Sequence, residues 1–304
     1  MKKLEPKLTP EWVGKKNPYR TIRIRIADAC NYNCSYCSEH DTLPKAPFME
    51  QYDMIQMLEN LKAIYQVEQR EQHLFIWGGE PTLNKSLLWF LKRVREYYSF
   101  ITNIELHSNL TLNYPDEFFE TINNLNIDVS SSIHLQYKFK TINMLRLAST
   151  GNLKEVNLMM DKLSDYDKCK EIKDLYSNKL PISIIPTFQL LDSDYKKVKM
   201  FLAASGQWMD QPIECSDTNR NYIEVRNTID LQGYYCRVPE DSFIVNTNGD
   251  IYLCQNDFMA KVKTPSNIFI PFQVETINNF INGRSLCNYK KCDCEQEILK
   301  TKKL

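Results

Sequence analysis

Three cysteines near the start of the chain are the residues best suited to chemistry. Cys30, Cys34 and Cys37 lie in the segment CNYNCSYC, at the spacing C-x3-C-x2-C. Thiolates bind zinc and iron–sulfur clusters, and a closed structural zinc site takes four ligands. Three cysteines on a [4Fe-4S] cluster leave one iron open, where a substrate or cofactor can bind. The spacing therefore favours such a cluster, and the alternative is a zinc site completed by His40 or a more distant residue.

The remaining cysteines divide into two sets. Cys169 and Cys215 stand alone, and we expect both to be inert thiols. No N-terminal apolar signal segment is present, so we expect the protein in the cytoplasm, where thiols stay reduced. Clustered cysteines there bind metal more often than they form disulfides. Five cysteines in the last quarter of the chain therefore predict a second, separate metal site. These five are Cys236, Cys254, Cys287, Cys292 and Cys294.

A second unusual segment is GGEPT, at residues 78–82. Glycine is scarce, with eight in the chain, yet Gly78 and Gly79 are adjacent. Adjacent glycines let a backbone approach a ligand closely or adopt conformations closed to other residues. Glu80 adds a carboxylate that suits a ligand ammonium group. This segment therefore predicts a ligand-binding loop.

Alternating strand-like and helix-like segments must position these loops. In residues 54–64, Met54, Met57, Leu58, Leu61 and Ile64 form one apolar helical face. Six strands alternating with helices predict parallel βαβ units with right-handed crossovers. We therefore expect an α/β fold, a strongly curved sheet or partial (β/α)6 TIM-like barrel. The expected strands are Thr21–Asp28, His73–Trp77, Asn103–Ser108, Ile127–His134, Glu155–Met160 and Ile182–Phe188.

In barrels of this type the chemistry lies at the C-terminal ends of the strands. The cysteine segment follows the first expected strand, GGEPT ends the second, and HSNLTLN ends the third. All three segments are therefore expected to meet on one face of the barrel.

The segments CNYNCSYC and, about forty residues later, WGGEPTLN resemble the radical S-adenosylmethionine (radical SAM) superfamily. Its signature is CxxxCxΦC with an aromatic Φ, here Tyr36. The resemblance implies a [4Fe-4S] cluster on Cys30, Cys34 and Cys37, with S-adenosylmethionine on the open iron. Reductive cleavage of that cofactor would give methionine and a 5′-deoxyadenosyl radical, which abstracts a hydrogen from the substrate.

The resemblance also implies roles for other residues in cofactor binding. Gly78, Gly79 and Glu80 would receive the methionine amino group, and the backbone around Tyr36 would flank the adenine. Ser108 and Asn109 match the start of a frequent TNG motif, although Leu110 replaces its glycine and leaves the local backbone shape open. Ser132 and His134, at the end of the fourth strand, would contact the ribose or the carboxylate. His107 is expected to be structural, because strand alternation can point it into the barrel.

The last hundred residues resemble the auxiliary-cluster extensions of this superfamily, called SPASM and Twitch domains. FIVN and DIYLC read as two strands around Asn248 and Gly249, a type I′ hairpin signal. The resemblance implies one additional [4Fe-4S] cluster of the Twitch kind on Cys236, Cys254 and two of Cys287, Cys292 and Cys294. Zinc bound by four thiolates is the alternative.

Composition limits the partners and the location of the protein. The 38 basic and 38 acidic residues balance, so no broad field favours nucleic acid or anionic lipid. No apolar run approaches the ~18 residues that span a bilayer, and we expect a cytoplasmic protein. We expect an N-terminal extension at 1–20, a barrel core at 21–205 and a small Cys-rich α+β extension containing a β-hairpin at 206–304.

The expected function is that of a radical SAM oxidoreductase or maturase, supplied with electrons by a protein such as flavodoxin or ferredoxin. The family resemblance favours peptide maturation by crosslinking, epimerisation or side-chain oxidation. The alternatives are dehydrogenation of a sugar or other small-molecule alcohol, and a non-catalytic iron–sulfur or zinc scaffold. About twenty residues precede the first expected strand. We expect that length to be too short for a fused leader-peptide-binding domain of the winged-helix type. A peptide substrate would then need a separate binding protein or direct recognition by the barrel and C-terminal domain.

Overall fold

Alternation along the first strand determines which side of the sheet is buried under helices. In β1 (Tyr19–Ala27), Ile22, Ile24 and Ile26 are fully buried and alternate with Arg23 and Arg25. Successive strand side chains point to opposite faces. The isoleucines belong to the apolar core shared with helix α1 (Gln51–Glu68), whereas the arginines lie on the inner face of the sheet. The outer face is therefore apolar and the inner face is polar.

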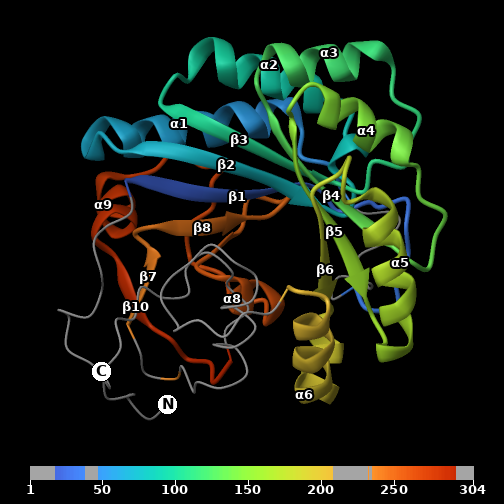
Figure 1. Cartoon of the computed structure of the whole chain (residues 1–304). Helices are drawn as coiled ribbons and strands as arrows, with labels where there is room; N and C mark the ends of the chain where they lie inside the picture. Colours follow the sequence, from blue (N-terminus) through green and yellow to red (C-terminus); the bar gives the residue numbers. More distant parts are fainter. Residues whose placement is uncertain (1–17, 38–46, 208–231, 233–234, 292–304) are drawn as a thin grey trace.

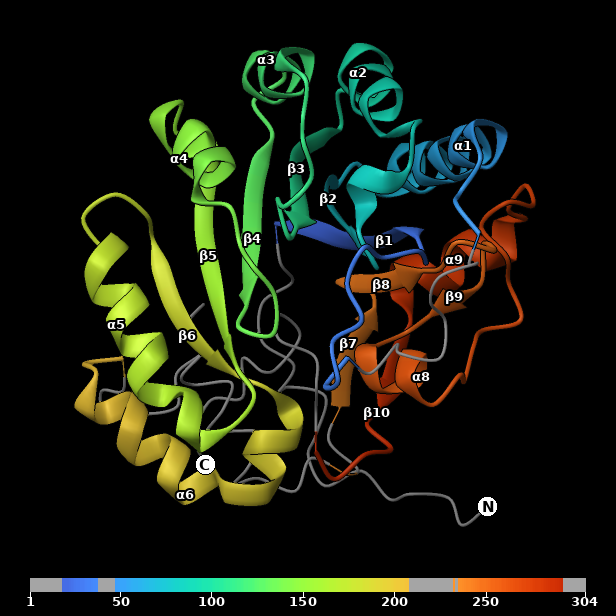
Figure 2. The ribbon, with the colours of Figure 1, turned by 90° about the vertical axis from the view of Figure 1, so that its right-hand side faces the viewer.

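The computed structural model describes residues 18–37, 47–207, 232 and 235–291. Its first six strands are parallel neighbours in the order β6-β5-β4-β3-β2-β1, and helices cover the convex side of the curved sheet (Figures 1 and 2). This confirms the partial barrel, which is not closed. The strands after β1 are β2 (Glu71–Gly78), β3 (Ile101–Ser108), β4 (Asp128–His134), β5 (Leu153–Met160) and β6 (Ile182–Pro186). The helical elements are η3 (Pro81–Leu83), α2 (Leu87–Tyr97), α3 (Asp116–Asn124), α4 (Thr141–Ser149), η4 (Leu163–Asp165), α5 (Tyr166–Tyr176) and α6 (Phe188–Ala204).

The end of the sixth strand differs from the sequence prediction. The strand was expected to reach Phe188, but that residue begins α6. Thr187 is the N-cap, and its hydroxyl accepts a hydrogen bond from the Leu190 amide at 3.3 Å. Threonine side chains satisfy the free amides of a helix start in this way, which explains why the strand stops at Pro186.

The C-terminal segment adds strands to the barrel sheet. Strand β8 (Ser242–Val245) pairs in parallel with β1, and β9 (Ile251–Tyr252) pairs antiparallel with β8. Among the residues that the structure describes, the sheet therefore has eight strands, and part of the segment expected as a separate extension continues the barrel. A second, antiparallel sheet is formed by β7 (Tyr235–Pro239) and β10 (Arg284–Leu286). Helices α8 (Gln255–Met259) and α9 (Val274–Asn282) complete this part.

The predicted hairpin is present, but its turn is of another type. A type I′ turn needs positive φ at both central residues. Gly249 has a φ of 81°, whereas the φ of Asn248 is not positive. The Gly249 amide donates to the Asn246 carbonyl and the Asn246 amide donates to the Asp250 carbonyl, both at 2.9 Å. The connection is thus a longer loop that ends with a left-handed glycine, and the type I′ prediction was wrong.

Buried polar side chains connect the C-terminal segment to the barrel. Arg20 is fully buried; it donates to the carbonyls of Glu240 at 2.9 Å and Phe280 at 2.8 Å and pairs with Glu68 at 2.8 Å. Asn60 on α1 donates to the carbonyls of Ile268 and Ile270. Buried donors that lose their acceptors are costly, so these contacts make the two parts one folded unit. Among the described residues, no helix is both long enough and apolar enough to cross a bilayer.

Candidate active site

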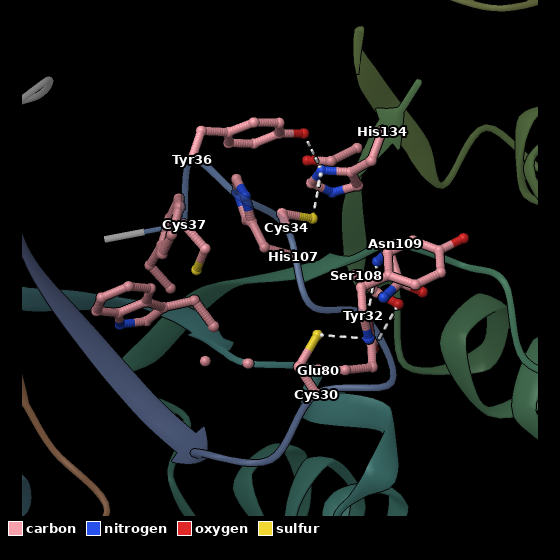
Figure 3. A pocket seen from close by; sticks show the side chains of 15 residues that line it. Cys30, Tyr32, Cys34, Tyr36, Cys37, Glu80, His107, Ser108, Asn109 and His134 are labelled. Carbon is pink, nitrogen blue, oxygen red and sulfur yellow. Dashed lines mark hydrogen bonds between the residues drawn. The ribbon is translucent and has the colours of Figure 1, made fainter. Parts of the chain in front are cut away.

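The C-terminal ends of the first four strands surround one pocket of about 240 Å³ (Figure 3). It is formed by the loops after β1, β2 and β3 and by the last residues of β4. Every residue predicted for the barrel site lines it, together with four others. The lining residues are Cys30, Tyr32, Cys34, Tyr36, Cys37, Phe75, Trp77, Gly78, Gly79, Glu80, His107, Ser108, Asn109, Ser132 and His134.

The three cysteines of the first loop share the electrostatic environment of this pocket. Burial raises the pKa of Cys30 to about 11, and negative charge on Glu80 and Cys37 adds to the increase. Burial, followed by charge on Cys37 and Cys30, raises the pKa of Cys34 to about 12. Three thiolates here are therefore unfavourable without a compensating cation, which the iron ions of a cluster would supply.

The described thiols do not form a site for a single metal ion. Within the described ranges, no three His, Cys, Asp or Glu side chains lie close enough to hold one metal ion. A cluster is ligated through several different iron atoms, so its cysteines need not converge on one point. His40, the residue considered for a zinc site, lies outside the described residues.

The glycine pair packs against the start of the cysteine loop. A Cβ atom on Gly79 would lie 2.4 Å from the Ala29 carbonyl oxygen and 2.5 Å from that of Asp28. A Cβ on Gly78 would lie 2.2 Å from the Ala27 carbonyl oxygen, and the φ of Gly78 is +151°. The sequence analysis assigned the glycines to close approach of a ligand. The structure adds a second reason for them, which is contact between two backbone segments.

Glu80 joins the loops that follow β2 and β3. Its buried carboxylate accepts hydrogen bonds from the Thr82 amide (3.1 Å) and hydroxyl (2.6 Å), the Ser108 hydroxyl (2.7 Å) and the Asn109 amide (2.8 Å). Burial raises the pKa of Glu80, and these hydrogen bonds oppose that increase. Four donors from the protein thus hold the carboxylate, which fixes Ser108 and Asn109 in place. Contact of Glu80 with a ligand amino group stays a prediction.

Leu110, which stands where the TNG motif has glycine, adopts a left-handed backbone conformation. Its φ is 53°, in the left-handed region, and its side chain is fully buried. A non-glycine residue pays about 1–2 kcal/mol for this conformation. The Asn143 amide group donates to the Leu110 carbonyl at 2.7 Å, and the Leu110 amide donates to the Ser108 hydroxyl at 3.1 Å. These contacts hold the loop in a shape that the sequence analysis had left open.

His134 contacts the cysteine loop from the end of β4. Its Nδ1 atom lies 2.6 Å from the Tyr36 hydroxyl and 3.5 Å from the Cys34 sulfur. Burial lowers the pKa of His134 to about 4, so the ring is neutral near pH 7. Burial also raises the pKa of Tyr36, which keeps the phenol protonated. The hydrogen bond thus joins a neutral phenol to a neutral imidazole beside the Cys34 sulfur.

This burial predicts acid sensitivity of the metal-free protein. The folded pKa of His134 lies below the unfolded value of about 6.5, so its contribution to stability is present above that pH and is lost as pH falls toward 4. We expect the free energy of unfolding to fall by up to about 1.4 kcal/mol per pH unit in this window. Urea unfolding of wild type and His134→Gln across this range checks the prediction. An equal slope in both proteins would contradict it.

Behind the cysteines, the inner face of the sheet is polar and aromatic. His107 Nε2 lies 2.6 Å from a Glu105 carboxylate oxygen, and the Ser130 hydroxyl donates to the same oxygen at 2.7 Å. The Phe75 ring packs on His107 with centroids 3.9 Å apart. Burial alone would raise the pKa of Glu105, but the contacts with His107 and Ser130 and the charge of Arg23 lower it. An ionised Glu105 therefore holds the proton of His107 on Nε2.

Four pocket residues were not assigned to the site from the sequence. Tyr32 lies between two of the cysteines, and Phe75, Trp77 and His107 lie at alternate positions of β2 and β3. The sequence analysis noted the strand alternation at His107 but interpreted this residue as structural. Applying the same period to all strand ends would have identified the three strand residues.

Three of the C-terminal cysteines lie in one region of the described structure. In the antiparallel pairing of β7 with β10, Cys236 lies opposite Ser285. Ser285 precedes Cys287 by two residues. The Cys287 thiol lies 3.4 Å from the Tyr289 carbonyl oxygen, and the Tyr289 hydroxyl donates at 2.9 Å to Asp257, three residues after Cys254. Cys292, Cys294 and Cys215 lie outside the described residues. Cys169 is fully buried on α5, away from the pocket.

Comparison with known proteins matches residues 24–137 to the Radical SAM superfamily. A probable GTP 3′,8-cyclase of Pyrococcus abyssi (strain GE5 / Orsay) is 27% identical over 129 residues, 41% of this chain and 39% of that protein. An S-adenosylmethionine-dependent nucleotide dehydratase of Fibrobacter sp. (strain UWH6) is 28% identical over 116 residues, 37% of this chain and 34% of that protein. The chain thus spans less than two fifths of either relative.

A solved structure of tagged anSMEcpe with bound AdoMet shares the fold. The two chains superpose with a TM-score of 0.57 at 14% identity, over 87% of this chain and 82% of the other. The partial barrel expected from the sequence is therefore also the architecture of a protein that binds AdoMet.

Proposed function

We propose that this chain, which carries a radical SAM domain at residues 24–137, binds a [4Fe-4S] cluster through Cys30, Cys34 and Cys37 and S-adenosylmethionine beside it. When bound and reduced, such a cluster cleaves S-adenosylmethionine to methionine and a 5′-deoxyadenosyl radical that abstracts a substrate hydrogen. The observation that carries the proposal is the pocket into which four strand ends bring the three thiols and the GGE loop.

The chain's own residues would bind and orient the cofactor. Gly78, Gly79 and Glu80 receive the amino group in this proposal, and the backbone at Tyr36 flanks the adenine. Glu80 keeps Ser108 and Asn109 at the rim through its hydrogen bonds. At the end of β4, Ser132 and His134 line the pocket where the ribose or carboxylate would lie.

Formation of 5′-deoxyadenosine tests this proposal. The protein is reconstituted anaerobically with iron and sulfide, mixed with S-adenosylmethionine and dithionite, and 5′-deoxyadenosine is followed by chromatography. We expect formation that requires both protein and reductant. A protein with full iron content that neither forms the product nor binds S-adenosylmethionine would indicate a non-catalytic scaffold instead.

For the substrate we propose peptide maturation, with dehydrogenation of a small-molecule alcohol as the alternative. The polar inner face supports a substrate that presents an O–H or N–H group. Nε2 of His107 contacts the Glu105 carboxylate at 2.6 Å, and Figure 3 shows the His107 ring pointing into the pocket. Two relatives with nucleotide substrates in their names give the small-molecule alternative further support. A flavodoxin or ferredoxin in the cytoplasm would supply electrons.

The His107 tautomer is open to direct measurement. A hydrogen bond to an ionised carboxylate contributes about 1.5–3 kcal/mol, so we expect at least about a tenfold preference for the proton on Nε2. The chain has four histidines, which makes nitrogen-15 imidazole spectra assignable by single substitutions. Glu105→Gln should weaken the preference, and His134 serves as the internal reference. A proton found mainly on Nδ1 of His107 would contradict the expectation.

We also propose an auxiliary [4Fe-4S] cluster on Cys236, Cys254 and two of Cys287, Cys292 and Cys294, as in Twitch or SPASM domains. The contacts of Tyr289 with Cys287 and with Asp257, three residues after Cys254, support it. So does the hydrogen bond from the Asn256 side chain to the Lys291 carbonyl (2.6 Å), which brings residues 291 and 256 together.

Iron counting distinguishes the two sites. A variant with Cys30, Cys34 and Cys37 all changed to alanine is expected to keep roughly four irons per chain, the content of one [4Fe-4S] cluster. Its absorption spectrum should retain the cluster band. A variant that holds no iron would argue against the auxiliary cluster, and one zinc ion per chain would support the structural zinc alternative.

A further inference from the structure

The loop after β4 contacts the backbone of the cysteine loop between its metal-binding positions. We call residues 135–140 the β4–α4 loop. The Asn33 amide donates to the Tyr137 hydroxyl at 2.7 Å, and the Ser35 amide donates to the Gln136 side-chain oxygen at 3.2 Å. The Gln136 side-chain amide in turn donates to the Ser35 hydroxyl at 2.6 Å. Two amides on either side of Cys34 are therefore bound by adjacent residues of one loop.

Aromatic packing strengthens the same contact. The Tyr32 and Tyr137 rings are stacked with centroids 4.0 Å apart and an angle of 7° between their planes. The Tyr32 hydroxyl donates to the Lys138 carbonyl at 3.3 Å. Stacked aromatic rings bury a large apolar area against each other. The β4–α4 loop thus binds three residues of the cysteine loop, at positions 32, 33 and 35.

Within the described residues 30–37, the cysteine loop makes few hydrogen bonds of its own. Its described turn is closed by the Cys37 amide donating to the Cys34 carbonyl at 3.0 Å. On the side of β3, Asn31 is bound by the Asn109 side chain at 2.7 Å and donates to the Thr111 hydroxyl at 2.9 Å. Those contacts fix the loop next to Cys30. The β4–α4 loop provides the corresponding support next to Cys34.

We propose that Gln136 and Tyr137 are positioning residues that hold Cys34 in its metal-binding orientation and determine which backbone amides of the loop can face the cluster. The inference rests on the proposed cluster at Cys30, Cys34 and Cys37. Amides that donate to cluster sulfurs alter the cluster's electronic properties. Asn33 and Ser35 donate their amides to the β4–α4 loop, so losing that loop's acceptors would free them for sulfur or water.

Substitutions of Tyr137 and Gln136 test this role. Tyr137→Phe keeps the ring stacked on Tyr32 and removes the acceptor for the Asn33 amide. Gln136→Ala removes both contacts with Ser35, whereas Gln136→Glu keeps the acceptor and serves as the conservative variant. Tyr97→Phe is the matched control, because Tyr97 is 58% exposed on α2 and does not line the pocket.

Two readouts on the reconstituted protein follow the cluster itself. Each lost hydrogen bond should raise the rate of iron release to a chelator by about fivefold, and Gln136→Glu should restore most of the wild-type rate. The electron paramagnetic resonance spectrum of the reduced cluster should change in Tyr137→Phe and stay unchanged in Tyr97→Phe. Wild-type iron release and an unchanged spectrum in the Gln136→Ala/Tyr137→Phe double variant would overturn the inference.

A third readout separates this inference from the proposed function. In the metal-free protein, hydrogen exchange of the Asn33 and Ser35 amides should accelerate about fivefold in Tyr137→Phe and Gln136→Ala, respectively. If Cys34→Ala binds as much iron as wild type, the proposed cluster site is wrong, whatever the exchange rates are. If wild type binds the cluster but the exchange rates do not change, the positioning role is wrong.

Discussion

Replacing Cys34 with alanine is expected to abolish reductant-dependent formation of 5′-deoxyadenosine, by at least about a thousandfold. Cys34 is 6% exposed and lies between Cys30 and Cys37 in the pocket. With two thiolates left, the loop has too few ligands to hold a cluster that depends on three. The measurement is the anaerobic assay described above, together with iron content.

Cys169→Ala is the matched control for this substitution. Cys169 is also a buried cysteine, but it lies on α5 and does not line the pocket. Its replacement leaves a similar small cavity, so a general loss of packing would affect both variants alike. We expect Cys169→Ala to retain wild-type activity and iron content. Activity of Cys34→Ala within tenfold of wild type would exclude the proposed ligand set.

The six barrel strands could be predicted from sequence because the residue pattern that specifies each strand lies within that strand. Alternating apolar residues such as Ile22, Ile24 and Ile26 indicate both that the segment is a strand and which of its faces is buried. Once parallel βα units are expected, the loops that end three successive strands must lie on one face. That is why Cys30 and Glu80, fifty positions apart, could be placed in one site without a structure.

Other features depend on contacts between distant segments that no local pattern contains. No residue pattern within 242–245 indicates that this strand pairs with β1. A short buried strand could equally belong to the edge of the barrel sheet or to a separate domain. The left-handed conformation of Leu110 runs against its own preference and is held by Asn143 from α4. The contacts of Gln136 and Tyr137 with the cysteine loop join exposed or half-buried polar groups, which have no hydrophobic signature.

Gly79→Ala is expected to lower the free energy of unfolding by about 3 kcal/mol or more and to remove the activity of the protein that remains folded. The new Cβ would lie 2.4 Å from one carbonyl oxygen and 2.5 Å from another. Both belong to backbone, so neither can move aside as a flexible side chain does. Overpacking typically costs about 1–3 kcal/mol, and lost hydrogen bonds add to that cost. Urea unfolding of the metal-free protein measures the change.

Gly151→Ala controls for the general effect of replacing a glycine. Gly151 has a φ of +78° but nothing within 4 Å of the added Cβ, so its substitution tests backbone strain without a clash. We expect it to cost about 1–2 kcal/mol and to leave the pocket unchanged. Comparable destabilisation by both substitutions would show that the close approach at Gly79 contributes little.

The effect of Gly79→Ala on activity follows from the hydrogen bonds around the displaced backbone. The Gly79 and Glu80 amides each donate at 2.8 Å, to the carbonyls of Ala27 and Ala29 respectively. Pushing these segments apart breaks both bonds and moves Cys30, the next residue along the first segment. It also moves the Glu80 carboxylate, which holds Ser108 and Asn109. Cofactor binding should therefore fail at urea concentrations where the barrel is still folded, and retained S-adenosylmethionine affinity in Gly79→Ala would contradict this coupling.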